Sequence, residues 1–465
     1  MPETRIEKDS LGEMAVPVDA LYGAQTARAV ENFPISGRTM PRPFLAAMGA
    51  IKLAAARTNA RLGLLPGELA DLIATAAEEV IDGRLDGHFP VDVYQTGSGT
   101  STNMNVNEVI ANRAIQLAGG VIGSKSPVHP NDHVNMGQSS NDVIPSAIHV
   151  SAAVEIVEQL IPALQALLEA LESKADEFDS IIKIGRTHLQ DAVPIRLGQE
   201  FGGYAAAVGN CIGHLEHAVE SLGELAIGGT AVGTGLNTHP EFDVGVCHAL
   251  SEYYGIGFRD AANHFAIQSN MDMVMQTSGT LRTSAVALGK IANDIRLMGS
   301  GPRCGIGELN LPAVQPGSSI MPGKVNPVIC EAMIQVACQV IGNDAAVTAG
   351  ATGGVGSILE LNMAMPMIAV NLLDSIRLLG AAVEVFRTKC VVGLTANAER
   401  CGQLVEQSLA MCTALATAIG YDAAAEIAKE AFKTGKTVRQ VATERQVLPT
   451  DKLNDLLDLR GQTER

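Results

Sequence analysis

Apolar residues recur at helical spacing through the middle of the chain. In residues 151–174 they follow one another at intervals of three and four, as Val154, Val157, Ile161, Leu164, Leu168 and Leu171. This spacing places them on one face of a helix. Pro162 predicts a kink or a helix start inside this stretch, because proline lacks the backbone N–H of a helix interior. Similar stretches at 196–223, 262–298, 329–348 and 357–386 bring the prediction to five long helices.

The pattern is different on either side of this helical region. Before about residue 137 the chain mixes short extended pieces and prolines with one helix predicted at 42–61. After Lys389 it becomes more polar, with helices predicted around 396–419 and 422–433. Alternating strand and helix units are absent from the sequence, which argues against a doubly wound α/β sheet. We predict a mainly all-α protein with a cap domain at 1–138, a helical bundle at 139–390 and a small helical domain at 391–465.

Composition adds an expectation about assembly. Of the 465 residues, 47% are apolar, yet there is no Trp and there are only 6 Tyr and 10 Phe. Small aliphatic side chains of this kind pack helix against helix. So large an apolar share suggests more buried surface than a monomer needs, and we therefore predict a subunit interface.

Charge and cysteine usage narrow the classes of partner. The net charge is −17 and no run of Lys or Arg exceeds two, so we expect no nucleic-acid partner and no membrane surface. The charged first residues lack the apolar region of a secretory signal, and we expect a cytoplasmic protein. The 8 cysteines are scattered with no C-x-x-C motif, which favours reduced thiols over disulfides or a zinc site.

Four polar segments that contain glycine interrupt the hydrophobic chain, at 95–107, 129–142, 185–194 and 317–326. The last belongs to the string GSSIMPGKVNP at residues 317–327, which ends just before a predicted helix. Backbone N–H groups at a helix start, together with Lys324, could bind a carboxylate. Seen alone, the same string could equally be a surface loop with a solvated lysine.

This string resembles the signature loop of the fumarase/aspartase superfamily. Further resemblance lies in QTGSGT from Gln95, HPNDHVN from His129, QSSND from Gln138, GRTHLQDA from Gly185 and GGTAVGTGLN from Gly228. Within the superfamily the match is best to class II fumarate hydratases. The resemblance implies the three-domain fold of that superfamily and reversible hydration of fumarate to (S)-malate in the citric acid cycle. It also implies a homotetramer with a shared multi-helix core, active sites built from three chains each, and no cofactor or metal.

The resemblance implies roles for single residues in a reaction that needs a base, an acid and concentrated positive charge. Ser318 would take the carbon-bound proton, made more acidic by Lys324 and nearby N–H groups. His188 would handle water, with Glu331 orienting its ring. The expected substrate-binding residues are Ser98, Gly99, Thr100, Ser139, Ser140, Asn141, Thr187, Ser319, Val325 and Asn326. Any single Ser or Thr among them could instead be a helix cap.

A second, weaker anion site is implied at His129, Pro130, Asn131 and Asp132. The family often carries an arginine three residues before the histidine, where this chain has Ser126. We therefore expect the second site to be weak or absent. His129, Asp132 and His133 could also be metal ligands, but no further strong ligand motif follows them in the sequence.

Two other functions are compatible with parts of this sequence. An aspartate ammonia-lyase of the same superfamily would usually show GAGT where this chain has GSGT at 97–100, and STND where it has SSND at 139–142. Residues 185–201 and Val328, however, also match some aspartases. A structural protein on this scaffold, like the lens crystallins related to argininosuccinate lyase, could have lost its catalytic groups, but Ser318, Lys324 and His188 are all in place.

Overall fold

The computed structural model of the chain describes residues 3–464. These residues are mainly helical, which confirms the predicted fold class, and no sheet among them has more than two strands. One helical stretch, Ser140–Glu177, is long and apolar enough to span a membrane. Because 56% of its apolar window is buried inside the protein, it also fits a core helix.

The chain forms two compact units, each made of three separate segments. The first unit contains Met1–Pro162, Gly213–Ala285 and Cys338–Gly380, and the second contains Ala163–Ile212, Val286–Ala337 and Ala381–Arg465. The predicted domain boundaries near 138 and 390 follow a different division, and they stay a prediction.

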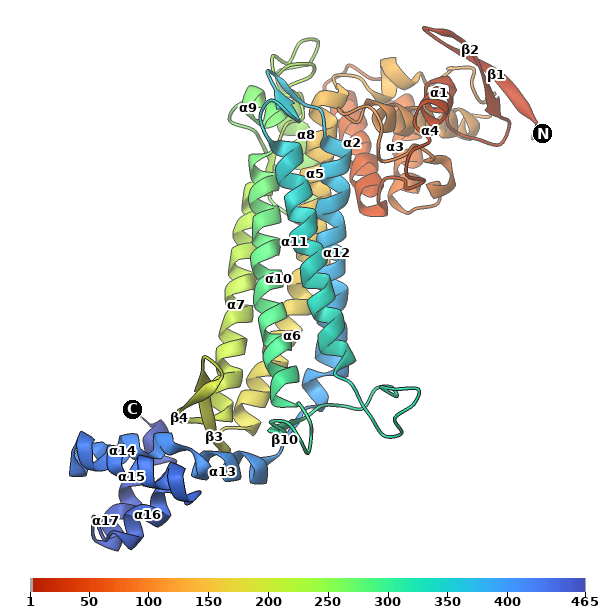
Figure 1. The fold of residues 1–465 in the computed structure, drawn as a ribbon. Helices are drawn as coiled ribbons and strands as arrows, with labels where there is room; N and C mark the ends of the chain where they lie inside the picture. The colour runs from red at the N-terminus through yellow and green to blue at the C-terminus, as the bar shows by residue number, and fades with distance from the viewer. Residues whose placement is uncertain (1–2, 465) are drawn as a thin grey trace. The chain divides into compact units, whose positions relative to one another are not determined.

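The N-terminal part of the first unit is more helical than predicted. A hairpin of β1 Thr4–Asp9 and β2 Gly12–Pro17 is followed by α1 Ala24–Asn32, α2 Arg42–Arg61, α3 Gly67–Ile81 and α4 Thr100–Leu117 (Figure 1). Only α2 was predicted, with the same bounds. In α4 the side chains of Asn103, Asn105 and Asn107 are buried, so its sequence lacks the apolar stripe of an ordinary core helix. Buried amides can take part in a helix core when hydrogen bonds satisfy them.

The remainder of the first unit contains the π-helical turns η2 Pro130–Val134 and η3 Ile156–Leu160 and the start of the long helices. Its other elements are α5 Ser140–Glu155, β5 Glu224–Leu225, α8 Phe242–Tyr254, β6 Arg259–Asp260, α9 His264–Ser269, β8 Ser357–Ile358 and β9 Leu361–Asn362. Pro162 is the second residue of α6 Ile161–Glu177, directly after the π-helical turn η3, so the regular α-helical pattern changes at the predicted place while the helical stretch itself continues through it.

Two long-helix predictions were wrong in extent. The stretch 262–298 is divided between α9 and α10 Asp272–Met298, and α12 Met365–Lys389 begins only after the β8–β9 hairpin. Asn362 explains the second difference, because its side-chain amide donates to Gly350 O (2.9 Å) and to Ser357 Oγ (2.8 Å) and so fixes a turn. Its oxygen also accepts the Ala364 N–H at the start of α12 (2.8 Å).

Buried polar contacts fix the long helices against one another in the first unit. Asp344, on α11 Val328–Ala351, accepts from Ser278 Oγ and from Arg282 Nη1 of α10, both at 2.7 Å. Its neighbour Asn343 donates to Ser375 Oγ of α12 at 3.0 Å. Since an unpaired buried polar group is costly, these pairs specify one register between the helices.

The second unit carries a hairpin and a C-terminal helical cluster. β3 Ile182–Thr187 and β4 Gln190–Arg196 form the hairpin ahead of α7 Leu197–Leu222 (Figure 1). β7 Leu309–Asn310 pairs with β10 Thr395–Ala396, and the chain ends with α13 Ala398–Gln407, α14 Cys412–Ile419, α15 Tyr421–Thr434, α16 Val438–Glu444 and α17 Thr450–Leu456. The helix predicted at 396–419 breaks at Ser408, whose Oγ accepts the Ala410 N–H at 3.2 Å.

Candidate functional site

Two predicted binding segments meet in the first unit. The Thr100 hydroxyl, at the first residue of α4, is hydrogen-bonded to Ser98 Oγ at 2.8 Å and to Ser140 Oγ at 2.7 Å. Ser98 and Ser140 are 8% and 9% exposed, whereas Thr100 is half-buried. Gly99, which precedes the helix, has a positive φ of 72°. The structure therefore brings together hydroxyl groups that are 40 positions apart in the chain.

The polar residues Ser139, Asn141 and Asp142 make hydrogen bonds at the start of α5. Ser139 caps this helix, because its Oγ accepts the Asn141 N–H at 3.2 Å while its own N–H donates to Asp142 Oδ1 at 2.9 Å. The Asn141 side chain donates to Ala231 O at 2.7 Å. The capping role considered for single serines is thus real for Ser139, and its binding role stays a prediction.

Asp142, which the sequence did not single out, ties α5 to the segment 228–230. Its Oδ2 accepts the N–H groups of Gly228 (3.1 Å) and Thr230 (2.8 Å). The side chain is fully buried, and burial raises the pKa of this carboxyl to about 6 although its N–H partners act in the opposite direction.

The signature loop, residues 317–327, lies in the second unit and is closed at its base. The Gly317 N–H donates to Lys324 O at 2.7 Å, and Asn326 Nδ2 donates to Gly317 O at 2.9 Å. Within the loop, Ser318 Oγ accepts the N–H groups of Ile320 (3.2 Å) and Met321 (3.1 Å). The N–H donors predicted around Ser318 are therefore present in its own loop.

An open cavity of about 510 Å³ adjoins this loop, and Ser318 and Lys324 both line it. Ser319, Lys324 and Val325 are exposed, and Ser318 is half-buried. Exposed binding groups on a loop leave room for a ligand or for another chain to complete the site.

His188 and Thr187 lie at the exposed tip of the β3–β4 hairpin. His188 and Leu189 have positive φ angles of 56° and 60°, so the tip is a tight turn that costs backbone strain. One strand residue before the tip, Arg186 Nη1 pairs with both carboxylate oxygens of the buried Glu308, at 2.9 and 3.0 Å. Lys183 Nζ lies 3.3 Å from Glu308 Oε2, so two cations anchor the hairpin to one carboxylate.

Glu331 lies in the first turn of α11, where its N–H donates to Pro327 O at 3.1 Å. Within the described residues 3–464 of one chain, no ion pair joins Glu331 to His188. Their predicted pairing stays a prediction, and in the predicted tetramer it concerns different chains.

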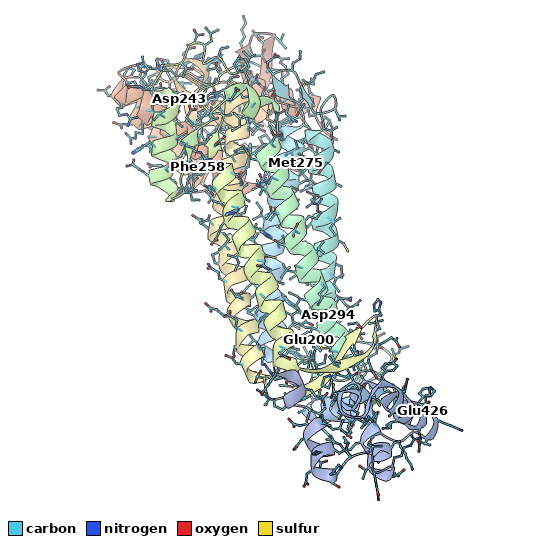
Figure 2. All side chains as sticks on the ribbon, turned by 90° about the vertical axis from the view of Figure 1, so that its left-hand side faces the viewer. Glu200, Asp243, Phe258, Met275, Asp294 and Glu426 are labelled. Carbon is cyan, nitrogen blue, oxygen red and sulfur yellow. The ribbon has the colours of Figure 1, made fainter. Side chains whose placement is uncertain are left out.

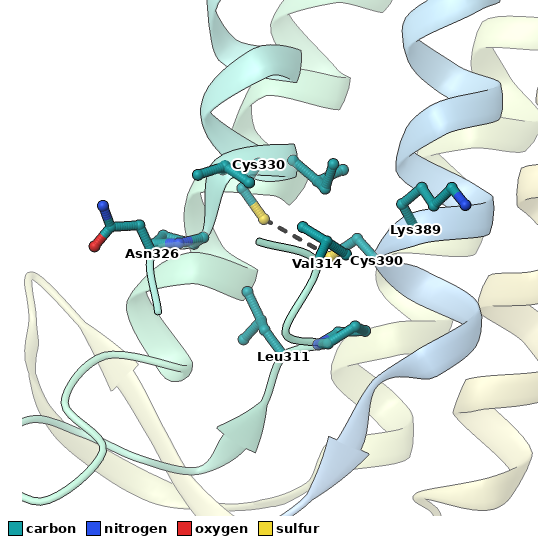
Figure 3. Close-up of a pocket in the computed structure, with 10 residues that line it drawn as sticks. Leu311, Val314, Asn326, Cys330, Lys389 and Cys390 are labelled. Carbon is teal, nitrogen blue, oxygen red and sulfur yellow. Dashed lines mark hydrogen bonds between the residues drawn. The ribbon is translucent and has the colours of Figure 1, made fainter. Parts of the chain in front are cut away.

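A second, smaller cavity lies beside the end of the signature loop. Figure 3 shows its lining, which includes Asn326, Lys389 and the thiols of Cys330 and Cys390, with the two sulfur atoms 3.8 Å apart. Its volume of about 10 Å³ can hold no more than a single water. It is too small for a dicarboxylate.

The segment predicted as a second anion site is a surface turn. His129 caps η2, because its Nδ1 accepts the N–H groups of Asn131 and Asp132, both at 3.2 Å. The same nitrogen lies 3.3 Å from Asp132 Oδ2. Pro130 is buried, whereas Asn131, Asp132 and Ser126 are exposed. The acidic Asp132 beside His129 does not favour a strong anion site here.

One group of side chains in the first unit has the spacing of metal ligands. Asp243, labelled in Figure 2, lies with Asp260 and His264 so that their ligand atoms are within 4.8 Å of one another. Both His264 nitrogens already have partners, Asp260 Oδ1 at 2.9 Å and Ala226 O at 3.0 Å. The hydrogen bond with Asp260 raises the pKa of His264, as in an ion pair that ties β6 to α9.

Comparisons with known proteins agree with the motifs. A lyase family model matches residues 12–342, and a model of the fumarase C C-terminus matches 411–461. The chain is 51% identical to class II fumarate hydratase of Neisseria meningitidis over 98% of each chain. It is 55% identical to that of Halobacterium salinarum over 99% of this chain and 97% of the relative. The crystal structure of class II fumarase from Schistosoma mansoni has a TM-score of 0.95 at 41% identity, covering 98% of both chains. The chain therefore belongs to the class II fumarate hydratase family of the fumarase/aspartase superfamily.

Proposed function

We propose that this protein is a fumarate hydratase, which adds water reversibly to fumarate to give (S)-malate. The relatives reported above carry this name at 51% and 55% identity over nearly the whole chain. The observation that carries the proposal in this chain is the signature loop, where two backbone N–H groups donate to the Ser318 oxygen beside a cavity that Lys324 also lines.

The base in this mechanism is Ser318. A serine hydroxyl is a weak base, but two N–H donors and a nearby ammonium stabilise its alkoxide form. In the dehydration direction Ser318 takes the proton from the carbon next to a carboxylate. The His188 side chain in its imidazolium form then gives a proton to the departing hydroxyl and becomes neutral imidazole, water leaves and the double bond of fumarate forms. Lys324 and backbone N–H groups balance the charge of the aci-carboxylate intermediate.

Neutral donors hold the substrate carboxylates. The hydroxyl chain of Ser98, Thr100 and Ser140 presents oxygen atoms within hydrogen-bond distance of one another. A bound carboxylate would replace part of that chain and accept its protons. Thr187, Ser319, Val325 and Asn326 complete the proposed binding set, and Glu331 orients His188.

The proposed working form is a cytoplasmic homotetramer without a cofactor. In this form one chain contributes the Ser98–Thr100 and Ser139–Asn141 groups, which are hydrogen-bonded to each other within a chain, a second contributes His188, and a third contributes the signature loop. The second anion site at 129–132 is expected to be weak, because Ser126 stands where an arginine would add positive charge.

The test is to follow the ultraviolet absorbance of the conjugated product from malate and, separately, from aspartate. Product from malate is expected, and product from aspartate alone would assign the chain to the ammonia-lyases instead. Ser318→Ala should lower kcat by about a hundredfold or more, since it removes the base. Gln315→Ala is the matched control, because it removes an exposed polar side chain that lines the same cavity but lies outside the proposed binding set, and it should keep most of the turnover. Equal activity of the Ser318→Ala variant would remove Ser318 from this role.

A further inference from the structure

Lys52 is a fully buried cation that the mechanism above does not use. It lies in α2 with 0% of its surface exposed. Its ammonium donates to three side-chain oxygens, Asn103 Oδ1 at 2.9 Å, Asn135 Oδ1 at 3.1 Å and Gln138 Oε1 at 2.9 Å. An ammonium has three N–H donors, so all of them are satisfied by protein. Lysine is almost never buried without such compensation, and its retention here therefore needs a reason.

The three acceptors come from three segments of the first unit. Asn103 is in the first turn of α4, one turn after Thr100. Asn135 directly follows η2, the turn that His129 caps. Gln138 directly precedes Ser139, the cap of α5. Lys52 thus joins the starts of both helices that carry the proposed carboxylate-binding hydroxyls, and it joins them to the 129–134 turn.

Further hydrogen bonds make these acceptors a connected network. Asn135 Oδ1 also accepts from Asn103 Nδ2 (3.2 Å) and from Asn107 Nδ2 (3.1 Å), and Asn135 Nδ2 donates to Gln138 O (3.1 Å). Removal of the ammonium would leave the oxygens of Asn103 and Gln138 without this partner in a buried place. Such a network holds its members in one arrangement while it is fully satisfied and loosens when one donor is lost.

A buried negative charge near Lys52 is consistent with this network. The charged group that acts on Lys52 is the fully buried Asp142, in the first turn of α5. The two groups are not within ion-pair distance, so the attraction acts through the helix start between them. Asp142 in turn holds segment 228–230, and the buried charges of Lys52 and Asp142 offset each other's cost of burial.

We propose that Lys52 is a positioning residue for substrate binding. It fixes the Ser98–Thr100 group relative to the start of α5, where Ser140 and Asn141 lie, without touching substrate. This inference rests on the proposed function only for the identity of the substrate. Its structural part, that Lys52 orders residues 129–141, is independent of which dicarboxylate is bound.

The test compares Lys52→Met with Ile51→Ala. Methionine keeps the length of the lysine chain but has no donor, whereas Ile51 is an adjacent, fully buried apolar residue of α2, so its change lowers stability without removing a donor from the network. The KM for fumarate should rise about tenfold or more in Lys52→Met with a smaller change in kcat, and it should change little in Ile51→Ala. Gln138→Met, which removes one acceptor, should raise KM in the same direction and provides a milder variant if Lys52→Met does not fold.

Amide hydrogen exchange on the full-length protein provides the second readout. Faster exchange at residues 129–141 in Lys52→Met or Gln138→Met, but not in Ile51→Ala, supports the proposal. Unchanged exchange together with an unchanged KM would overturn it. Failure of the wild-type protein to hydrate fumarate would instead overturn the proposed function, while the exchange result would still decide whether Lys52 orders this segment.

Discussion

Several side chains at the starts of α4 and α5 have both a structural role and a proposed role in substrate binding. Substitutions at such residues cannot separate the two roles. Ser139 is a helix cap, and Asn141 is tied to Ala231 O, so changing either alters the fold locally as well as any ligand contact. The Thr100 hydroxyl instead joins only other hydroxyl groups, Ser98 Oγ and Ser140 Oγ. Thr100 is therefore the cleaner probe of the binding set.

Thr100→Val should raise the KM for fumarate about tenfold, because valine keeps the shape of threonine but cannot donate to a carboxylate. The melting temperature should shift little, as the hydroxyl is half-buried and valine fills the same volume. Steady-state kinetics and thermal unfolding measure the two effects. The matched control is Thr96→Val, which breaks the exposed hydrogen bond between Thr96 and Ser101 (2.8 Å). Similar KM values for the two variants would contradict a binding role for Thr100.

Lys52 also predicts a pH dependence of stability. Burial lowers the pKa of Lys52 to about 7 from its ordinary value of 10.5, so the unfolded chain holds the proton over a range in which the folded chain releases it. The folded state therefore gains stability as pH rises from 7 towards 10.5, by at most about 1.4 kcal/mol per pH unit. In Lys52→Met this gain is absent. Urea unfolding at about pH 7.5 and about pH 9.5 should thus show a wild-type advantage that grows with pH, and a constant difference would refute the depressed pKa.

At the scale of elements, the β3–β4 hairpin is held by the fully buried Glu308, whose carboxylate pairs with Arg186 and Lys183. Neutralising it leaves two cations without their shared partner and loosens the hairpin that carries His188. Glu308→Gln should therefore lower kcat by about tenfold or more, because His188, the proposed proton donor, is misplaced. The KM should rise by a smaller factor, because Thr187 moves with the hairpin while the hydroxyls of Ser98, Thr100 and Ser140 lie on other segments.

The control for this hairpin is Glu200→Gln. Glu200, labelled in Figure 2, pairs with Lys183 at 2.7 Å but not with Arg186. The Glu200→Gln variant should keep kcat within a few-fold of wild type, because Glu308 still holds both Arg186 and Lys183. Equal losses in the two variants would show that the hairpin responds to any charge change near Lys183 rather than to Glu308.

Periodicity found α2 and the long helices, and it missed several shorter helices, among them α3, whose buried face is made largely of alanine. It predicted α2 with its observed bounds, and it located the long helices because their apolar spacing extends over many turns. It missed α4, where buried asparagines replace apolar residues, and it joined 357–362 to α12 because the hairpin there depends on Asn362 contacts with Gly350 and Ser357. Those contacts are tertiary, and no local pattern records them.

Some residues of the candidate site could likewise be predicted from the sequence, and others could not. Motif resemblance located the polar segments and the signature loop, since these are strings of unusual residues. It assigned no role to Lys52, Asp142 or Glu308, because the burial of a charged side chain cannot be read from its neighbours in the sequence. Their roles depend on partners from distant segments, such as Arg186 and Glu308, which are 122 positions apart.

For the whole molecule, α10 favours the predicted assembly. It carries the large apolar side chains of Met275, Val286 and Leu297, which are 39%, 54% and 40% exposed in a single chain; Figure 2 labels Met275. Apolar groups repeated along the exposed side of one helix are typical of a surface that another subunit covers. The signature loop and the hairpin tip are likewise exposed in a single chain, as expected if neighbouring chains complete the predicted site.

If Ser318 and His188 of one active site come from different chains, two inactive variants should restore activity when mixed. In a tetramer assembled at random from equal amounts of Ser318→Ala and His188→Asn chains, a site is intact only when its Ser318 comes from a His188→Asn chain and its His188 comes from a Ser318→Ala chain. That happens in about one quarter of sites, so co-expressed chains should recover up to about one quarter of wild-type activity. Each variant alone should stay near zero, and so should separately assembled tetramers combined without subunit exchange. Native mass spectrometry would establish that mixed tetramers form; mixed tetramers without activity would mean that each chain builds its own site.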